Sequence, residues 1–124
     1  MSVTYKSLLE AANAVVPKIS GKDAIEMVAN GAMLLDVRDG TEVAASGKAV
    51  GAIHISRGSL ESKADPTTSN PEKNFAFDRP VILHCGGGGR AALAGKLLKD
   101  MGYQKVFNLG GLKDWIEAGG KVER

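Results

Sequence analysis

The alternation of strand and helix is clearest in the segment PVILHCGGGGRAALAGKLLKDMG, at residues 80–102. The apolar run at residues 80–84 is typical of a short strand that is covered on both faces. Four glycines follow Cys85, and residues 90–101 then carry apolar side chains at helical spacing until Gly102 stops the helix. The segment therefore predicts a strand, a glycine turn and a helix, in that order.

The same alternation extends toward both ends of the chain. Further strands are expected at residues 32–37, 52–55 and 106–109. Helices are expected at residues 4–16, 23–28, 41–46 and 112–118, with a helical turn at residues 58–63. Strands that alternate with helices indicate an α/β fold with a mainly parallel sheet.

Length, charge and cysteine content narrow the classes of protein. A chain of 124 residues fits one compact domain. A net charge of +2 is too small to indicate a nucleic-acid or membrane partner. We find neither a membrane-spanning run nor an export signal, so the cytoplasm is the expected location. The single cysteine rules out an intrachain disulfide, a multi-cysteine metal site and a dithiol redox pair.

Cys85 is the candidate reactive residue. It leaves a strand at the edge of the sheet where ligands of α/β proteins bind. The glycines at residues 86–89 allow several N–H groups to point at one centre, and the start of the next helix adds partial positive charge. Both features favour a thiolate, and Arg90 adds a permanent cation. We expect the thiol to lie in an open cradle, because reactive thiols need electropositive, accessible settings. A lone cysteine is otherwise often an inert core residue, and glycines often mark only a tight turn; the combination favours function.

Four motifs occur in a recognisable order: LDVR at 35–38 followed by Glu42, GAIHI at 51–55, Cys85 to Arg90, and GY at 102–103 through LGG at 109–111 to Trp115. Together they resemble the single-domain rhodanese (thiosulfate sulfurtransferase) family over residues 19–122. The resemblance implies a three-layer α/β/α fold with a mainly parallel central sheet of four to five strands. Residues 18–124 would form this domain, with residues 1–17 as an N-terminal helical segment packed on it.

The resemblance implies a sulfurtransferase that needs neither a metal nor an organic cofactor. Cys85 would take a sulfane sulfur from a small anionic donor, thiosulfate or a persulfide, and pass it to cyanide or a thiol, a protein thiol included. The amides of Gly86, Gly87, Gly88 and Gly89 would hold the persulfide, with Arg90 adding positive charge. Many members carry arginine or lysine directly after the catalytic cysteine. Here Gly86 removes that cation, which could bind the sulfonate end of thiosulfate.

Two alternatives stay open. The chain could be a non-transferring rhodanese-like module that senses oxidants or sulfide or binds a protein. A cysteine phosphatase is less favoured, because those enzymes place five residues between cysteine and arginine. Here only residues 86–89 intervene, which makes a tighter cradle. A phosphate-binding P-loop is excluded, because no Gly-Lys-Ser/Thr follows the glycines.

For the remaining polar candidates we expect structural or solvent-exposed roles. Adjacent strand residues face opposite ways, so we expect His84 to point away from the thiol. We expect His54 to be a core histidine and Arg57 a solvated loop residue, with a role in the site as the alternative for each. Arg38 and Glu42 are expected to form an ion pair that braces the turn after the first strand.

Overall fold

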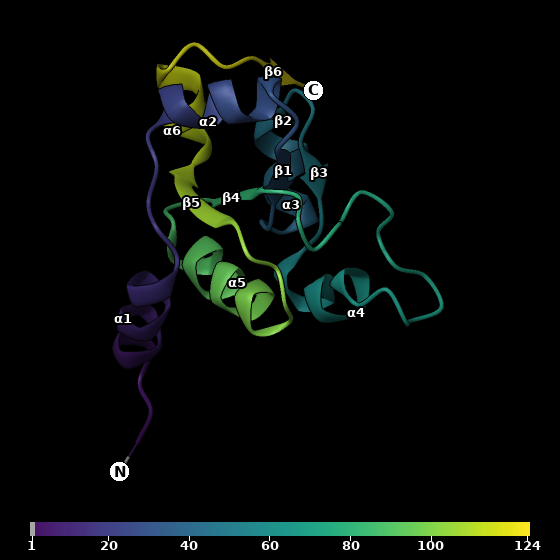
Figure 1. The fold of residues 1–124 in the computed structure, drawn as a ribbon. Coiled ribbons are helices and arrows are strands. Elements are labelled where there is room, and N and C mark those ends of the chain that lie inside the picture. The colour runs from purple at the N-terminus through teal and green to yellow at the C-terminus, as the bar shows by residue number, and fades with distance from the viewer. Residues whose placement is uncertain (1) are drawn as a thin grey trace.

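The computed structural model describes residues 2–124 and has an α/β architecture around a parallel sheet (Figure 1). The four strands lie in the order β3-β1-β4-β5, and every neighbouring pair is parallel. Their bounds are Met33–Asp36 for β1, Ile53–His54 for β3, Val81–Cys85 for β4 and Val106–Gly111 for β5. The expected fold class and the predicted strand segments are confirmed.

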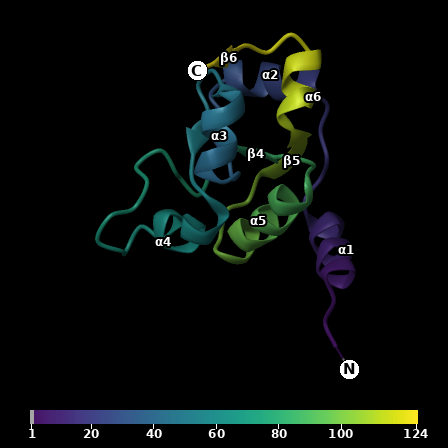
Figure 2. The same ribbon diagram turned by 180° about the vertical axis from the view of Figure 1, so that it is seen from behind.

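Helices cover both faces of this sheet, which gives three layers (Figures 1 and 2). On one face, α4 (Leu60–Ala64) and α5 (Gly89–Asp100) pack over Leu35 and Leu83. On the other, α2 (Gly21–Ala29) and α6 (Leu112–Glu117) pack over Leu34 and Ile82. Neighbouring strand residues thus belong to different cores, as the two-residue period of a strand requires. A single-turn 3-10 helix, η1 (Arg57–Ser59), leads into α4.

A second, small sheet was not foreseen from the sequence. Strand β2 (Lys48–Ala49) pairs antiparallel with β6 (Val122–Glu123) near the C-terminus. The Lys48 ammonium lies 2.6 Å from the Glu123 carboxylate across this pair. The two strands thereby bring the C-terminal end of the chain against the segment that follows α3 (Gly40–Ser46).

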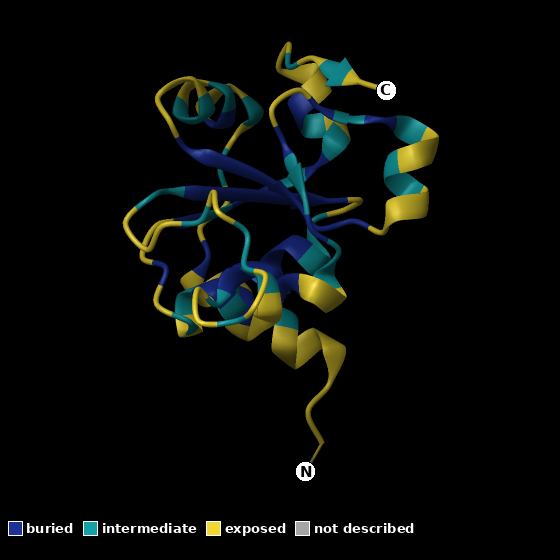
Figure 3. Cartoon of the chain, turned by 90° about the vertical axis from the view of Figure 1, so that its right-hand side faces the viewer, coloured by how far each residue is buried: buried dark blue, intermediate teal, exposed yellow. Residues whose placement is uncertain are grey.

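The N-terminal helix α1 (Tyr5–Val15) packs beside α5, and much of its surface faces outward (Figure 3). Thr4 caps it, since its side-chain oxygen accepts the N–H of Ser7 at 3.0 Å. After α1 the chain joins the free edge of β5, because Asn108 bonds through its backbone to both Pro17 and Ile19. A division into residues 1–17 and 18–124 stays a prediction. Among residues 2–124, no helix combines the length and apolar character needed to cross a bilayer.

The register between β4 and β5 slips at the end that carries the cysteine. Leu83 pairs with Asn108, but His84 pairs with Gly110, so β5 holds one extra residue there. Such a bulge redirects side chains. Here it lies beside the turn that leads from β4 into α5.

Candidate active site

Cys85 is the last residue of β4 and lies underneath the glycine turn. Its exposed fraction is only 1%, whereas Gly86 and Gly87 are exposed. We expected the thiol in an open setting, and this expectation is wrong. The sulfur belongs to the core cluster between the sheet and α5, and the loop covers it.

Two backbone N–H groups point at the sulfur. Gly88 donates to Sγ of Cys85 at 2.9 Å, and Ala91 donates at 3.4 Å. Both lie at the start of α5, where Gly88 is the residue before the first turn, with φ at 101°. An L side chain rarely adopts this φ, so glycine is required there. Donors at the positive end of a helix stabilise negative charge on the sulfur.

Asn108 fixes the loop from β5. Its side-chain Nδ2 donates to the carbonyl of Gly88 at 3.1 Å, and its Oδ1 accepts the N–H of Gly110 at 2.8 Å. Asn108 is 4% exposed, so these bonds satisfy a buried amide. Our sequence reasoning missed this residue. A polar side chain inside the apolar run at residues 106–109 was the available signal.

Gly89 lies where α1 packs against the glycine loop. A methyl group on Gly89 would lie against the Tyr5 hydroxyl and 3.8 Å from a methyl of Leu9. The absence of a side chain at this position therefore lets α1 pack on the first turn of α5. Gly87, by contrast, has open space where its Cβ would be. The consecutive glycines thus serve different purposes.

Arg90 is bound by Glu42 and does not point its fork at the sulfur. Its Nη1 and Nη2 lie 2.6 and 3.0 Å from the two carboxylate oxygens of Glu42. The pair sits beside Gly86, where an added Cβ would lie 3.1 Å from Nη2. The hydrogen bond from Arg90 lowers the pKa of Glu42 to about 2, and the same contact raises the pKa of Arg90.

The expected ion pair between Arg38 and Glu42 is wrong. Arg38 instead folds back onto Asp36, with Nη2 2.8 Å from Oδ2, and donates to the carbonyl of Gly47 at 2.8 Å. Asp36 is fully buried, so its carboxylate needs the nearest available cation. Burial alone would raise the pKa of Asp36, but the hydrogen bonds from Arg38 outweigh it and the pKa is lowered.

Among residues 2–124, the hydrogen bonds to the Cys85 sulfur come from Gly88 and Ala91 and from neither histidine. Nε2 of His84 lies 3.8 Å from Asp36, which pairs with His84 across the sheet, while Cys85 joins the core on the opposite face. Burial lowers the pKa of His84, although Asp36 opposes this effect. Nε2 of His54 lies 2.7 Å from the carbonyl of Arg38. Arg57 pairs with Glu61 one helical turn away, at 3.1 Å.

The Arg90–Glu42 contact predicts a specific acid titration. Unfolded Glu42 titrates near its ordinary 4.5, whereas the folded residue titrates at about 2. The stabilisation by this pair is therefore complete above pH 4.5 and is lost as the pH falls through about 2. A carbon NMR titration should find the low midpoint for Glu42 and a midpoint shifted toward 4.5 in Arg90→Gln. Arg57→Gln is the matched control, and a wild-type midpoint near 4.5 would contradict the pair.

Comparison with known sequences points to one family. A model described as Rhodanese-like domain matches residues 20–118. A curated relative, the thiosulfate sulfurtransferase GlpE of Haemophilus influenzae, is 32% identical over 105 residues. That alignment covers 82% of this chain and 89% of the relative.

Two solved structures resemble this chain over nearly its whole length. A Rhodopseudomonas palustris protein, described as of unknown function and a possible tyrosine phosphatase, has a TM-score of 0.88 and 33% identity. The match covers 99% of this chain and 96% of that one. The polysulfide-sulfur transferase homodimer of Wolinella succinogenes has a TM-score of 0.76 and 34% identity, covering 96% of this chain and 86% of that one.

Proposed function

The chain belongs to the family of rhodanese-like domains, and from this premise we propose that it is a sulfurtransferase that carries sulfane sulfur on Cys85. The observation that supports this most strongly is the pair of N–H groups, from Gly88 and Ala91, directed at the sulfur. They stabilise the negative charge that Sγ carries as a thiolate, before it attacks the donor and after it is released by the acceptor. In the persulfide the charge lies on the outer sulfur.

The reaction is a double displacement. The Cys85 thiolate attacks the outer sulfur of the donor, and the sulfur–sulfur bond of the donor breaks with its electron pair on the leaving group. The leaving group is sulfite when the donor is thiosulfate and a thiolate when it is a persulfide. An acceptor thiolate or cyanide then attacks the outer sulfur of the Cys85 persulfide and restores the enzyme thiolate. Atoms and electrons balance without a metal or an organic cofactor.

The loop geometry supports sulfur transfer over phosphate ester hydrolysis, the activity suggested for the Rhodopseudomonas relative. A phosphatase loop needs a free arginine fork for the phosphate oxygens. Here Glu42 takes one N–H of each terminal nitrogen of Arg90 and so fixes the direction of the fork. In addition, only residues 86–89 separate Cys85 from Arg90, one residue fewer than in cysteine phosphatases. We therefore assign Arg90 a part in shaping the loop and in the local charge, and we expect no measurable hydrolysis of p-nitrophenyl phosphate.

The proposed partners are a small anionic sulfur donor and a thiol or cyanide acceptor, with a protein thiol among the candidates. The relative from Haemophilus is named for thiosulfate, and the one from Wolinella for polysulfide. A reducing compartment such as the cytoplasm suits a chain with a single cysteine.

Steady-state kinetics separate a transferase from a sensor. With thiosulfate or polysulfide as donor and cyanide or glutathione as acceptor, a transferase gives parallel double-reciprocal lines, because the two substrates react in separate half-reactions. A sensor module would form an oxidised or sulfur-bearing Cys85 without turning over. Absence of turnover with every donor and acceptor pair would refute the transferase proposal.

Gly86 offers a gain-of-function prediction about the donor. Gly86→Lys should lower the KM for thiosulfate about fivefold, because one added, partly exposed ion pair stabilises binding by up to about 1 kcal/mol. The KM for a persulfide donor, which lacks the sulfonate end of thiosulfate, should change less. Gly87→Lys is the matched variant one residue further along the exposed loop, and its effect should be smaller. An unchanged thiosulfate KM in Gly86→Lys would contradict this account of donor choice.

A further inference from the structure

Asn108 is a polar residue on the face of β5 that otherwise carries core residues. Its register partner on β4 is Leu83, which belongs to the core between the sheet and α5, as does Val106 two residues earlier in β5. Paired residues of neighbouring strands, and residues two apart in one strand, project to the same face of a sheet. The Asn108 side chain therefore lies on the α5 side of the sheet, which is also the side of the Cys85 sulfur.

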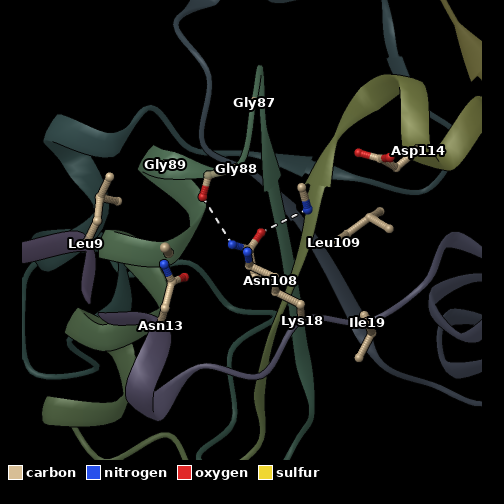
Figure 4. A pocket seen from close by; sticks show the side chains of 12 residues that line it. Leu9, Asn13, Lys18, Ile19, Gly87, Gly88, Gly89, Asn108, Leu109 and Asp114 are labelled. Carbon is tan, nitrogen blue, oxygen red and sulfur yellow. Dashed lines mark hydrogen bonds between the residues drawn. The ribbon is translucent and has the colours of Figure 1, made fainter. Parts of the chain in front are cut away.

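Both polar groups of this side chain bond to backbone around the glycine loop (Figure 4). Nδ2 donates to the carbonyl of Gly88, and Oδ1 accepts the N–H of Gly110. The Gly88 carbonyl already accepts the N–H of Ala92 at 2.9 Å, as in the first turn of any α-helix. The need to pair a buried acceptor therefore does not explain the bond from Asn108. Its effect is to fix the direction of this carbonyl.

Gly88 depends on such a restraint more than most residues. It lies between Gly87 and Gly89, and a glycine backbone has the widest conformational freedom. The same three residues border a cavity of about 400 Å³, so packing supports only part of the turn. Asn108 holds the carbonyl of Gly88, while the N–H of Gly88 donates to Sγ of Cys85 at 2.9 Å. The residue that is restrained is thus the residue that brings its N–H to the sulfur.

The N–H of Gly88 has its largest effect in the second half-reaction. Sγ of the Cys85 persulfide is neutral, because the charge of a persulfide lies on the outer sulfur. When the acceptor attacks the outer sulfur, the sulfur–sulfur bond breaks and its electron pair returns to Sγ as negative charge. A donor that already points at Sγ stabilises this charge as it develops. In the loading step, by contrast, the charge on Sγ is consumed.

Resting on the proposed sulfur transfer, we propose that Asn108 is a positioning residue: it holds Gly88 so that its N–H stays on the Cys85 sulfur, and it thereby speeds release of sulfur from the persulfide. Asn108 acts through the backbone of Gly88 and needs no contact with donor or acceptor. The second donor, the N–H of Ala91, is held by α5 itself. Loss of the Asn108 bond should therefore weaken the pair of donors without abolishing it.

Two substitutions of Asn108 share one defect and differ in the others. Asn108→Asp keeps an oxygen for the N–H of Gly110, but as a carboxylate it cannot donate to Gly88, and it adds a negative charge. Asn108→Leu adds no charge but loses both bonds. Slowing that is common to both variants therefore reports the missing donor to Gly88. Leu109→Ala is the matched control, because Leu109 follows Asn108 in β5, is equally buried at 4% exposure and packs in the core on the opposite face.

Single-turnover measurements separate the two half-reactions. Loading is followed with thiosulfate or polysulfide, at a pH where its rate no longer rises, and discharge of the isolated persulfide is followed with cyanide as thiocyanate formation. Both Asn108 variants should discharge about tenfold more slowly than the wild type, as expected when a hydrogen bond to a charged group is weakened. Their loading rates should not fall. Leu109→Ala should lower the thermal midpoint and leave both rates unchanged.

Amide hydrogen exchange, measured by NMR on the unloaded protein, gives a readout that does not depend on sulfur transfer. In both Asn108 variants the N–H of Gly88 should exchange about tenfold faster than in the wild type, and the N–H of Ala91 should change less. Failure of the wild type to take up sulfur would refute the proposed function, whereas the exchange rates would still test the hold of Asn108 on Gly88. Unchanged exchange at Gly88, equal slowing of loading and discharge, or slowing no greater than in Leu109→Ala would overturn the assignment of Asn108.

Discussion

Replacing Cys85 with serine is expected to abolish sulfur transfer, with a loss of at least about a thousandfold in kcat/KM. A serine oxygen cannot form the persulfide, and the chain contains no second cysteine that could substitute. The N–H groups of Gly88 and Ala91 would remain in this variant. The loss of activity would therefore report the missing thiol and not the loss of these donors. The measurement is the rate of thiocyanate formation from cyanide with the donor that serves the wild type best.

The control for this substitution is the folded state. Cys85 is buried next to two N–H donors, and a serine hydroxyl can accept from both, so the far-UV circular dichroism and thermal midpoint should change little. Retention of more than a few per cent of activity by a folded Cys85→Ser protein would exclude Cys85 as the sulfur carrier.

Asp36→Ala is expected to have the largest effect on stability, lowering the free energy of unfolding by about 3–5 kcal/mol. The Arg38 guanidinium is nearly as buried as Asp36, with exposed fractions of 5% and 0% for the two side chains. Removal of the carboxylate would leave a buried cation whose main partner is gone. The remaining acceptors, the Ser46 hydroxyl and the Gly47 carbonyl, carry no full charge. Urea denaturation monitored by Trp115 fluorescence measures the change.

Two further variants distinguish loss of charge pairing from loss of packing. Asp36→Asn keeps an oxygen acceptor and should be less damaging than Asp36→Ala. A double variant, Asp36→Leu with Arg38→Met, removes both charges and should recover much of the loss, because replacing a buried pair costs less than breaking it. A loss below about 1 kcal/mol in Asp36→Ala would show that the pair is not a structural requirement.

The main sheet and its helices were predictable from the sequence because each has a strong local signal. The apolar runs at 32–37 and 80–84 are long enough to identify strands, and Gly102 marks the end of α5, as expected. The pairing of β2 with β6 had no such signal. Two-residue strands show no periodicity, and this pair depends on a contact between residues far apart in the chain.

The contacts of the candidate site were predictable only in part. The position of Cys85 before a helix N-terminus followed from residue order, and the structure places Gly88 and Ala91 accordingly. The ion-pair partners of Glu42 and Arg38 could not be predicted from the sequence. Arg38 lies near Glu42 in the sequence, whereas Arg90 comes near Glu42 only in the folded chain. The buried carboxylate of Asp36 competes for Arg38 and leaves Glu42 to Arg90.

The depth of the sulfur also lay beyond the sequence. The glycines suggested an exposed thiol, but exposure depends on how the loop folds over the end of β4. Asn108 ties Gly88 down from β5, and the bulge after Leu83 brings Gly110 opposite His84. Both are features of strand register, which residue patterns in a single segment do not specify.

The central claim, that Cys85 carries a sulfane sulfur, is tested most directly by intact-mass spectrometry after incubation with thiosulfate or polysulfide and removal of the donor. We predict a gain of one sulfur atom per chain, located to the peptide that contains Cys85, reversed by an acceptor thiol and absent in Cys85→Ser. No mass gain with any donor, or a gain that persists in Cys85→Ser, would contradict the account.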